Sequence, residues 1–150
     1  MLRIRLIVCL GVLGLCGAAA APYAQEARRY IAPSTAAGSG PPFSGAVQVG
    51  NTLYLAGDIG LDETQKVPDT AEAEARLLLN NVQATLKKAG FTMDDLVSVT
   101  VYCSDVKHYA AFNSVYRSYF KKEFPARAFI GAGTLLFNAR FEMQGIAVKR

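Results

Sequence analysis

The chain has little cysteine and a single histidine, and both shortages narrow the chemistry open to it. Of Cys9, Cys16 and Cys103, the first two fall in an N-terminal segment with the pattern of a leader. One remaining cysteine cannot form an internal disulfide, so the folded part must depend on its core or on self-association. Because His108 is the only histidine, there is no set of His and Cys side chains for a metal site. We interpret Cys103 as a packed, unreactive thiol and His108 as a surface residue.

Excess charge of one sign is also missing. The sequence has 16 Lys and Arg against 12 Asp and Glu, a net charge of +4 that falls to +2 without Arg3 and Arg5 of the leader. Such a mild excess does not indicate a nucleic-acid partner.

The sustained apolar run at the N-terminus is too short to span a membrane well. Residues 1–5 include two arginines, residues 6–15 are mostly apolar, and small residues follow. This order is typical of a secretory signal, with cleavage after Ala20 or Ala24. We therefore expect residues 1–24 to be removed and the product to be periplasmic or secreted, without stable membrane insertion. If the leader does not function, the alternative is a cytoplasmic protein. About 125 residues would remain, enough for one compact domain.

The first half of the mature chain reads as a flexible segment followed by a hairpin. Residues 25–40 are small and polar, which predicts a flexible approach segment. The strand-like runs 46–49 and 52–59 flank Gly50-Asn51, a connection that favours a β-hairpin. Residues 60–68 have turn chemistry and predict a loop.

A helix is predicted next, with clear start and stop signals. Asp69 can cap it, Glu72 sits three residues on as a capping-box partner, and Gly90 ends it. Its solvent face is expected to carry Glu74 among other polar residues. Apolar residues at helical spacing predict the buried face: Leu78, Leu79, Val82 and Leu86.

The second half predicts three more strands and one helix. Period-two alternation marks a strand over 96–102, Asp105 can cap a helix that Pro125 ends, and strands follow at 126–131 and 141–148. The order β-β-α-β-α-β-β predicts an α+β fold, one sheet with both helices on one face. The open face would be covered by a symmetric oligomer. An aromatic stripe on the second helix reads as core: Phe112, Val115, Tyr116, Tyr119 and Phe120.

One arginine and one carboxylate stand out in the last quarter of the chain. Arg127 lies in Phe-Pro-Ala-Arg-Ala-Phe-Ile, and Glu142 lies in Phe-Glu-Met-Gln-Gly-Ile-Ala-Val. An arginine fork matches a substrate carboxylate through two parallel hydrogen bonds, and a glutamate can orient or deprotonate a water. Together they suggest hydrolysis of a small carboxylic acid. From the residues alone, a surface ion pair between neighbouring strands is the alternative.

Four segments carry a family resemblance: VGNTLYLAGDI (49–59), FNSVY (112–116), FPAR (124–127) and FEMQGIAV (141–148). In this order they resemble the RidA family, also called YjgF, over a domain of residues 41–150. The resemblance implies a chorismate-mutase-like fold with a mixed sheet, and a homotrimer with sites between subunits. It also implies hydrolytic deamination of reactive 2-imino and enamine carboxylic acids to 2-oxo acids and ammonia, with no cofactor.

The resemblance extends to individual site residues. Arg127 falls on the family's carboxylate-binding arginine and Glu142 on its water-orienting glutamate. Asn113 matches an asparagine that lines the cleft, and Gly57 matches a glycine that supplies backbone at the site. These matches imply that Arg127 and Glu142 are catalytic and that Arg127, Gly57 and Asn113 bind substrate.

The chain departs from the family pattern beside these residues. Ala56 stands where archetypal members have a serine, Phe43 where they have a tyrosine, and Phe129 where a small residue is common. If the two missing hydroxyls only hold substrate, each loss costs about 0.5–1.5 kcal/mol. If one relays a proton, the loss approaches a hundredfold in rate. Asp58 replaces a neutral side chain and is expected to repel an anionic substrate or to pair with Arg127.

Two other functions stay open. One is a non-catalytic trimer that binds small carboxylates or a protein partner, which the lost hydroxyls and Asp58 favour. The other is a ribonuclease activity attached to relatives, for which the sequence offers no RNA-binding motif and no strong basic run.

Overall fold

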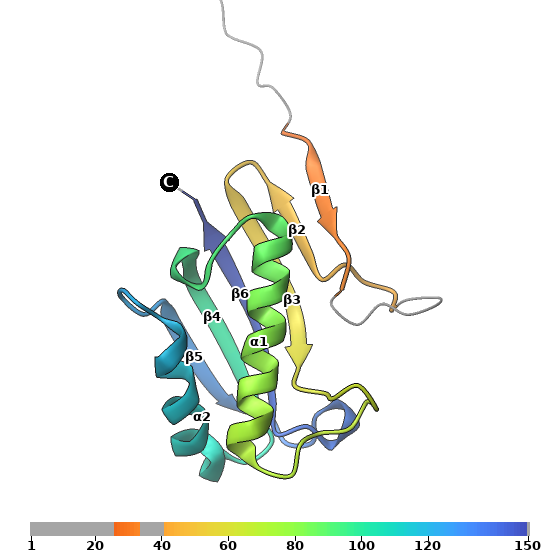
Figure 1. Ribbon diagram of the computed structural model, residues 1–150, viewed down its shortest axis with the longest axis vertical. Coiled ribbons are helices and arrows are strands. Elements are labelled where there is room, and N and C mark those ends of the chain that lie inside the picture. The colour runs from red at the N-terminus through yellow and green to blue at the C-terminus, as the bar shows by residue number, and fades with distance from the viewer. Residues whose placement is uncertain (1–25, 34–40, 150) are drawn as a thin grey trace, which may run out of the picture.

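The computed structural model describes residues 26–33 and 41–149 (Figure 1). The predicted leader, residues 1–24, lies outside the described residues and stays a prediction. No helix within the described part of the chain is long and apolar enough to cross a membrane.

One mixed six-stranded sheet forms the framework, in the order β1-β2-β3-β6-β4-β5. Neighbouring strands are antiparallel except β4 and β5, which run parallel. Both helices lie on the same face of the sheet (Figure 1), as the predicted α+β fold requires. The strands are β1 Arg28–Ile31, β2 Ala46–Val49, β3 Thr52–Ile59, β4 Leu96–Cys103, β5 Ala126–Gly131 and β6 Phe141–Val148; the helices are α1 Ala71–Ala89 and α2 Tyr109–Tyr116. Short 3-10 turns occupy Met93–Asp95, Val106–His108, Arg117–Tyr119 and Leu136–Asn138.

The strand bounds agree with the sequence predictions except at two places. The predicted strand 96–102 runs one residue further, to Cys103. Part of the predicted flexible segment, Arg28–Ile31, instead forms β1, which pairs antiparallel with β2. Composition could not indicate this strand, because it is held by backbone pairing to the edge of β2 and by burial of Ile31 alone among its four side chains.

The start of α1 differs by one residue from the prediction. Thr70, rather than Asp69, is the N-cap, and its side chain accepts a hydrogen bond from the backbone N–H of Ala73 at 3.2 Å. The predicted stop is confirmed, since Gly90 ends the helix in the left-handed conformation at φ 83°.

Glu74 was expected on the solvent face of α1, but it is fully buried. Its carboxylate accepts hydrogen bonds from the backbone N–H groups of Arg140 at 2.6 Å and Phe141 at 3.0 Å, and from Arg140 Nη1 at 2.8 Å. The same guanidinium donates to the carbonyls of Pro68 and Asp69, both at 2.9 Å. Glu74 and Arg140 therefore tie α1 to the preceding loop and to the start of β6.

The second helical segment begins where predicted and ends early. Asp105 caps the first turn by accepting from Lys107 N–H at 2.9 Å. Helical geometry stops at Tyr119, and Phe120 is already extended, so Pro125 does not end the helix. The predicted aromatic stripe is confirmed as core: Phe112, Val115 and Tyr116 are buried, and Tyr119 and Phe120 pack against them.

Cys103 is the packed thiol that was predicted, whereas His108 is not a plain surface residue. Cys103 is fully buried, and its Sγ lies 3.0 Å from the carbonyl oxygen of Asp105. Burial raises the pKa of the Cys103 thiol, which disfavours the reactive thiolate. His108 is half-buried, and its ring packs edge-on against Phe141 at 6.1 Å.

The buried thiol gives a simple prediction for protein lacking residues 1–24. Cys103 should not react with iodoacetamide at pH 8 in the folded protein and should react completely in denaturant, because reagent reaches the thiol only on unfolding. Intact-mass spectrometry over time measures both rates. Rapid labelling of the folded protein would show that the strand end around Cys103 opens readily.

Candidate functional site

An irregularity in β3 turns two site residues to the open face of the sheet. The register with β6 shifts between Leu55 and Asp58. Leu55 is buried under the helices, and Asp58 Oδ1 accepts from Asn81 Nδ2 of α1 at 3.4 Å. With both flanking residues directed at α1, the intervening Ala56 and Gly57 lie on the face that the helices leave uncovered.

Glu142 lies on the same open face, directly over Gly57. Its neighbours Phe141 and Met143 are buried in the core, so the alternation of β6 directs Glu142 the other way. A Cβ atom built on Gly57 would overlap Glu142 Oε1 and would lie 3.1 Å from Cδ. Gly57 is therefore needed to leave room for the carboxylate, and the structure brings these two predicted site residues together.

Gly57→Ala should displace the Glu142 carboxylate without unfolding the protein, because the atoms in the way are the far end of a flexible side chain. A misplacement of about 1 Å at a catalytic group costs roughly a hundredfold in rate, so we expect turnover to fall by about that factor. The measurement is kcat/KM for 2-iminobutanoate, and the melting temperature shows whether the variant stays folded. Gly131→Ala is the matched strand control, since its Cβ would meet only a side-chain methyl of Val106 at 3.2 Å. Equal activity of the two variants would contradict this role for Gly57.

Phe43 lies in the loop that precedes β2. It is 55% exposed and comes two residues before Gly45, whose carbonyl accepts from Ala56 N–H at 3.0 Å. Phe43 is thus two residues from the backbone group that pairs with Ala56, the other position where a hydroxyl is missing.

Arg127 lies on the opposite, helix-covered face. It pairs in register with the buried Val99 of β4. Its Cζ stands 4.7 Å from the ring centroid of Tyr116, 5.7 Å from that of Phe129 and 5.9 Å from that of Tyr109. Within residues 26–33 and 41–149, no carboxylate forms an ion pair with Arg127. Aromatic rings hold the guanidinium by cation–π contact and leave its charge uncompensated.

A hollow of about 300 Å³ opens beside this guanidinium. Asn113 and Arg127 both line it, so these two predicted residues lie close together. Burial raises the pKa of Tyr116 to about 12, and its hydroxyl has no hydrogen-bond partner among the described residues. The other lining residues are Arg117, Phe124 and Pro125.

Phe129 takes part in the support of Arg127. Its ring meets Tyr109 edge-on at 4.9 Å and Phe112 at 5.6 Å. The large side chain that replaces a small one therefore fills space between α2 and β5 beneath the guanidinium.

Asp58 does not meet Arg127 within the chain. Its carboxylate accepts from Ile59 N–H at 2.8 Å and from Asn81, and Asn81 also donates to the Ile59 carbonyl at 3.2 Å. These bonds turn the charge toward α1 and away from the open face that carries Glu142.

Arg127 and Glu142 likewise do not meet within one chain. Strand β4 separates β5 from β6, and the two side chains point to opposite faces of the sheet. The structure thus contains two half-sites, one with Gly57 and Glu142 and one with Asn113 and Arg127.

The sequence reasoning missed Tyr109 and treated Tyr116 only as core. Both lie beside the Arg127 guanidinium. A signal was present, because Tyr109 and Asn113 are four residues apart and so share a helix face. No group of three His, Cys, Asp or Glu that could hold a metal occurs in the described ranges.

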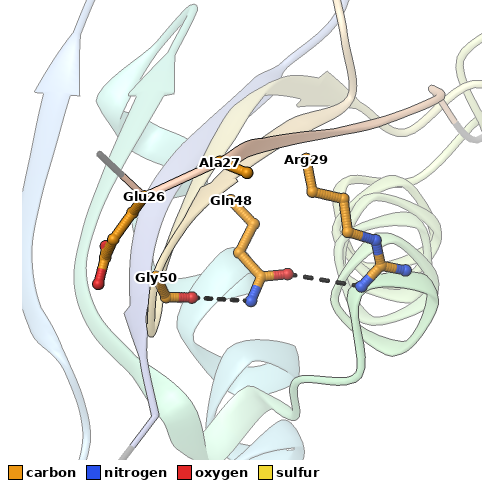
Figure 2. Close-up of a pocket in the computed structure, with 5 residues that line it drawn as sticks. All are labelled: Glu26, Ala27, Arg29, Gln48 and Gly50. Carbon is orange, nitrogen blue, oxygen red and sulfur yellow. Dashed lines mark hydrogen bonds between the residues drawn. The ribbon is translucent and has the colours of Figure 1, made fainter. Parts of the chain in front are cut away.

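A second hollow, of about 410 Å³, lies at the β1–β2 edge and contains none of these residues. Figure 2 shows Gln48 between Gly50 and Arg29. Arg29 also donates to the carbonyls of Lys88 at 3.2 Å and Ala89 at 3.5 Å. Arg29 thus caps the carbonyl groups at the C-terminal end of α1. Because this arginine lines the hollow, we assign the hollow a structural role.

Known proteins share both this fold and this sequence pattern. The structure matches the YjgF gene product of E. coli with a TM-score of 0.75 and 32% identity, covering 81% of this chain and 99% of that one. RidA from the Antarctic bacterium Psychrobacter sp. PAMC 21119 matches with a TM-score of 0.74 and 29% identity, over 81% and 99%. A family model described as Endoribonuclease L-PSP matches residues 33–149. The chain belongs to the RidA/YjgF family.

Curated members of the RidA/YjgF family resemble the chain over most of their length. A protein of Capra hircus named 2-iminobutanoate/2-iminopropanoate deaminase is 37% identical over 124 residues, 81% of this chain and 90% of its own. The human protein of the same name is 36% identical over the same shares. A RutC family protein of Aquifex aeolicus is 36% identical over 72% of this chain and 89% of its own.

Proposed function

We propose that this RidA/YjgF protein hydrolyses 2-imino and enamine carboxylic acids to 2-oxo acids and ammonia. The observation that carries the proposal is the Arg127 guanidinium, which aromatic rings hold beside a hollow with no carboxylate paired to it. A planar guanidinium of this kind is suited to bind a substrate carboxylate through two hydrogen bonds. Relatives at 36–37% identity that are named imine deaminases support the same reaction.

Hydrolysis of an imine needs mainly a correctly oriented substrate and water. With the substrate carboxylate on Arg127, Glu142 would orient a water toward the C=N carbon, take up one of its protons and pass that proton to the imine nitrogen, which gives a carbinolamine. The carbinolamine hydroxyl then loses its proton to nitrogen, and the C–N bond breaks as the C=O bond forms, which releases ammonia. Because imines already hydrolyse in water, positioning and modest proton transfer are sufficient to accelerate the reaction.

The two half-sites require a second copy of the chain. We propose a homotrimer in which Arg127 and Asn113 of one protomer face Gly57 and Glu142 of a neighbour. The open sheet face supports this, because a continuous row of side chains crosses β1, β2, β3 and β6 without helix cover: Tyr30, Val47, Tyr54 and Ile146. Tyr30 and Tyr54 are largely exposed in the single chain. Association through this face would bury them.

A non-catalytic carboxylate-binding trimer is the second candidate. Ala56 favours it, since it lies beside Gly57 on the open face without a hydroxyl to offer. Calorimetry that shows binding of a 2-oxo acid without any turnover would select this function.

Ammonia release tests the proposed activity. An amino-acid oxidase generates 2-iminopropanoate or 2-iminobutanoate in the cuvette, and ammonia is followed with and without the purified protein lacking residues 1–24. We expect faster release than the spontaneous rate, in proportion to protein concentration. Equal rates with and without active protein would end this proposal.

A further inference from the structure

Tyr109 brings a hydroxyl to the Arg127 half-site that the motif comparison did not indicate. It opens α2, four residues before Asn113, so both side chains lie on one face of the helix. Its ring meets Phe129 edge-on at 4.9 Å, and Arg127 Cζ lies 5.9 Å from its centroid. The side chain is 47% exposed, so its polar end is accessible to a small ligand.

The surroundings of the Tyr109 hydroxyl are polar and positive. Hydrogen bonding with the Asn113 side chain, followed by the positive charge of Arg127, lowers the pKa of Tyr109 below its usual value. Hydrogen bonding with Arg127 and the charge of Arg117 act in the same direction. The Tyr109 ring and Asn113 lie on one face of α2, and the Arg127 guanidinium of β5 lies against that ring. Asn113 and Arg127 also line the hollow.

We propose that Tyr109 is a further substrate-binding residue, whose hydroxyl donates a hydrogen bond to the carboxylate that Arg127 holds. The inference rests on the proposed function, because it takes the substrate to be a carboxylic acid. A carboxylate has about four lone-pair sites, and a bidentate guanidinium occupies two of them, so an acceptor site stays available for a phenol. The donor set of phenol, amide and guanidinium is selective for an anionic oxygen pair over a neutral amide or ester.

The chain lacks two hydroxyls that the RidA/YjgF pattern has, because Ala56 and Phe43 stand where that pattern has a serine and a tyrosine. Ala56 is next to Gly57 on the open face, and Phe43 lies in the loop that reaches Ala56 through Gly45, whereas Tyr109 lies with the Arg127 half-site. The hydroxyl that helps to hold the substrate is thus supplied from the arginine side in this protein.

Tyr109→Phe isolates the hydroxyl, since phenylalanine keeps the ring contacts with Phe129 and Arg127. The probe is 2-oxobutanoate, the product of the proposed reaction with 2-iminobutanoate. Calorimetry measures its binding, and KM and kcat for 2-iminobutanoate are measured in parallel. We expect binding about tenfold weaker or more and KM raised by a similar factor, with kcat within about threefold, because a hydrogen bond to a charged group is lost. Tyr119→Phe is the matched control: its hydroxyl bonds Arg76 O at 3.1 Å and Asn80 Oδ1 at 2.7 Å, away from the hollow. That variant should bind 2-oxobutanoate as the unaltered protein does.

The pH dependence gives a second readout. Binding of 2-oxobutanoate should weaken as the pH rises through the lowered pKa of Tyr109, because the phenolate cannot donate and repels a carboxylate. The charged groups that act on Tyr109 are Arg117 and Arg127. Burial raises the pKa of Tyr116 to about 12, so this neighbour does not account for a loss at lower pH. Tyr109→Phe should lack this alkaline loss.

The outcomes separate the inference from the proposed function. Ammonia release by the unaltered protein together with unchanged KM, binding and pH profile in Tyr109→Phe would overturn the role of Tyr109 alone. Binding of 2-oxobutanoate that depends on Tyr109, without any ammonia release, would support the role of Tyr109 and overturn the proposed reaction. Absence of both binding and turnover in the unaltered protein would overturn both.

Discussion

Arg127→Ala is expected to lower kcat/KM for 2-iminobutanoate by at least about a hundredfold and to leave the fold intact. The guanidinium would make two charge-assisted hydrogen bonds to the substrate carboxylate, each contributing about 1.5–3 kcal/mol. No described carboxylate pairs with it, so its removal does not strand a buried charge. Steady-state ammonia release measures the loss, and circular dichroism checks the fold.

Two companion variants distinguish a binding fork from general positive charge. Arg127→Lys keeps the charge and loses the bidentate geometry, so its activity should fall between those of the unaltered protein and the alanine variant. Arg117→Ala removes a second cation that lines the same hollow, with its Cζ 5.9 Å from the Phe124 ring. Its effect should be less than about fivefold, as for a screened, exposed charge. Equal losses from Arg117→Ala and Arg127→Ala would show that the hollow acts only through its net charge.

Glu74→Ala is expected to lower the free energy of unfolding by about 3–5 kcal/mol, the usual cost of breaking a buried ion pair. The change removes the acceptor of two backbone N–H groups and of one guanidinium N–H. It also frees the backbone of Arg140 and Phe141, directly before Glu142 at the start of β6. The melting temperature should fall by roughly 10–20 °C, measured by calorimetry at fixed protein concentration.

Glu72→Ala is the control for this prediction. Glu72 lies in the same first turn of α1, is exposed, and carries the same charge. Its loss should cost less than about 1 kcal/mol, the range for a carboxylate at a helix N-terminus. If the two variants melt at the same temperature, the buried pair is not what holds α1 to β6.

The case of Glu74 shows what the sequence could and could not indicate. Its spacing was informative, because it precedes Leu78 by one helical turn and so shares the buried face. Its charge argued for solvent, and only a partner makes a buried carboxylate tolerable. That partner, Arg140, is 66 residues away in the sequence, so local pattern cannot identify it.

The strands were predicted well because their signals are local, whereas the partner of Glu74 is distant in the sequence. Each of the predicted strands from Ala46 onward has its own periodicity and its own turn residues, and these signals are local. Strand β1 lacks them and forms because the edge of β2 offers unpaired backbone groups.

The sequence pointed to the residues of the candidate site but not to their arrangement. The motifs pointed to Arg127 and Glu142, and the structure brings Asn113 to the first and Gly57 to the second. That the arginine and the glutamate face opposite sides of the sheet depends on strand order, with β4 inserted between β5 and β6. Neighbouring positions in the sequence carry no information about that insertion.

Mixing two inactive variants is the most direct test of a site shared between protomers. Arg127→Ala and Glu142→Gln are each expected to be inactive alone. When they are unfolded together at equal concentration and refolded, chains associate at random, and one site in four receives both an intact arginine and an intact glutamate in any ring of identical interfaces. We predict about a quarter of the activity of the unaltered protein treated in the same way. Recovery of no activity from the mixture, with a normal oligomer formed, would contradict a site made by Arg127 of one protomer and Glu142 of its neighbour.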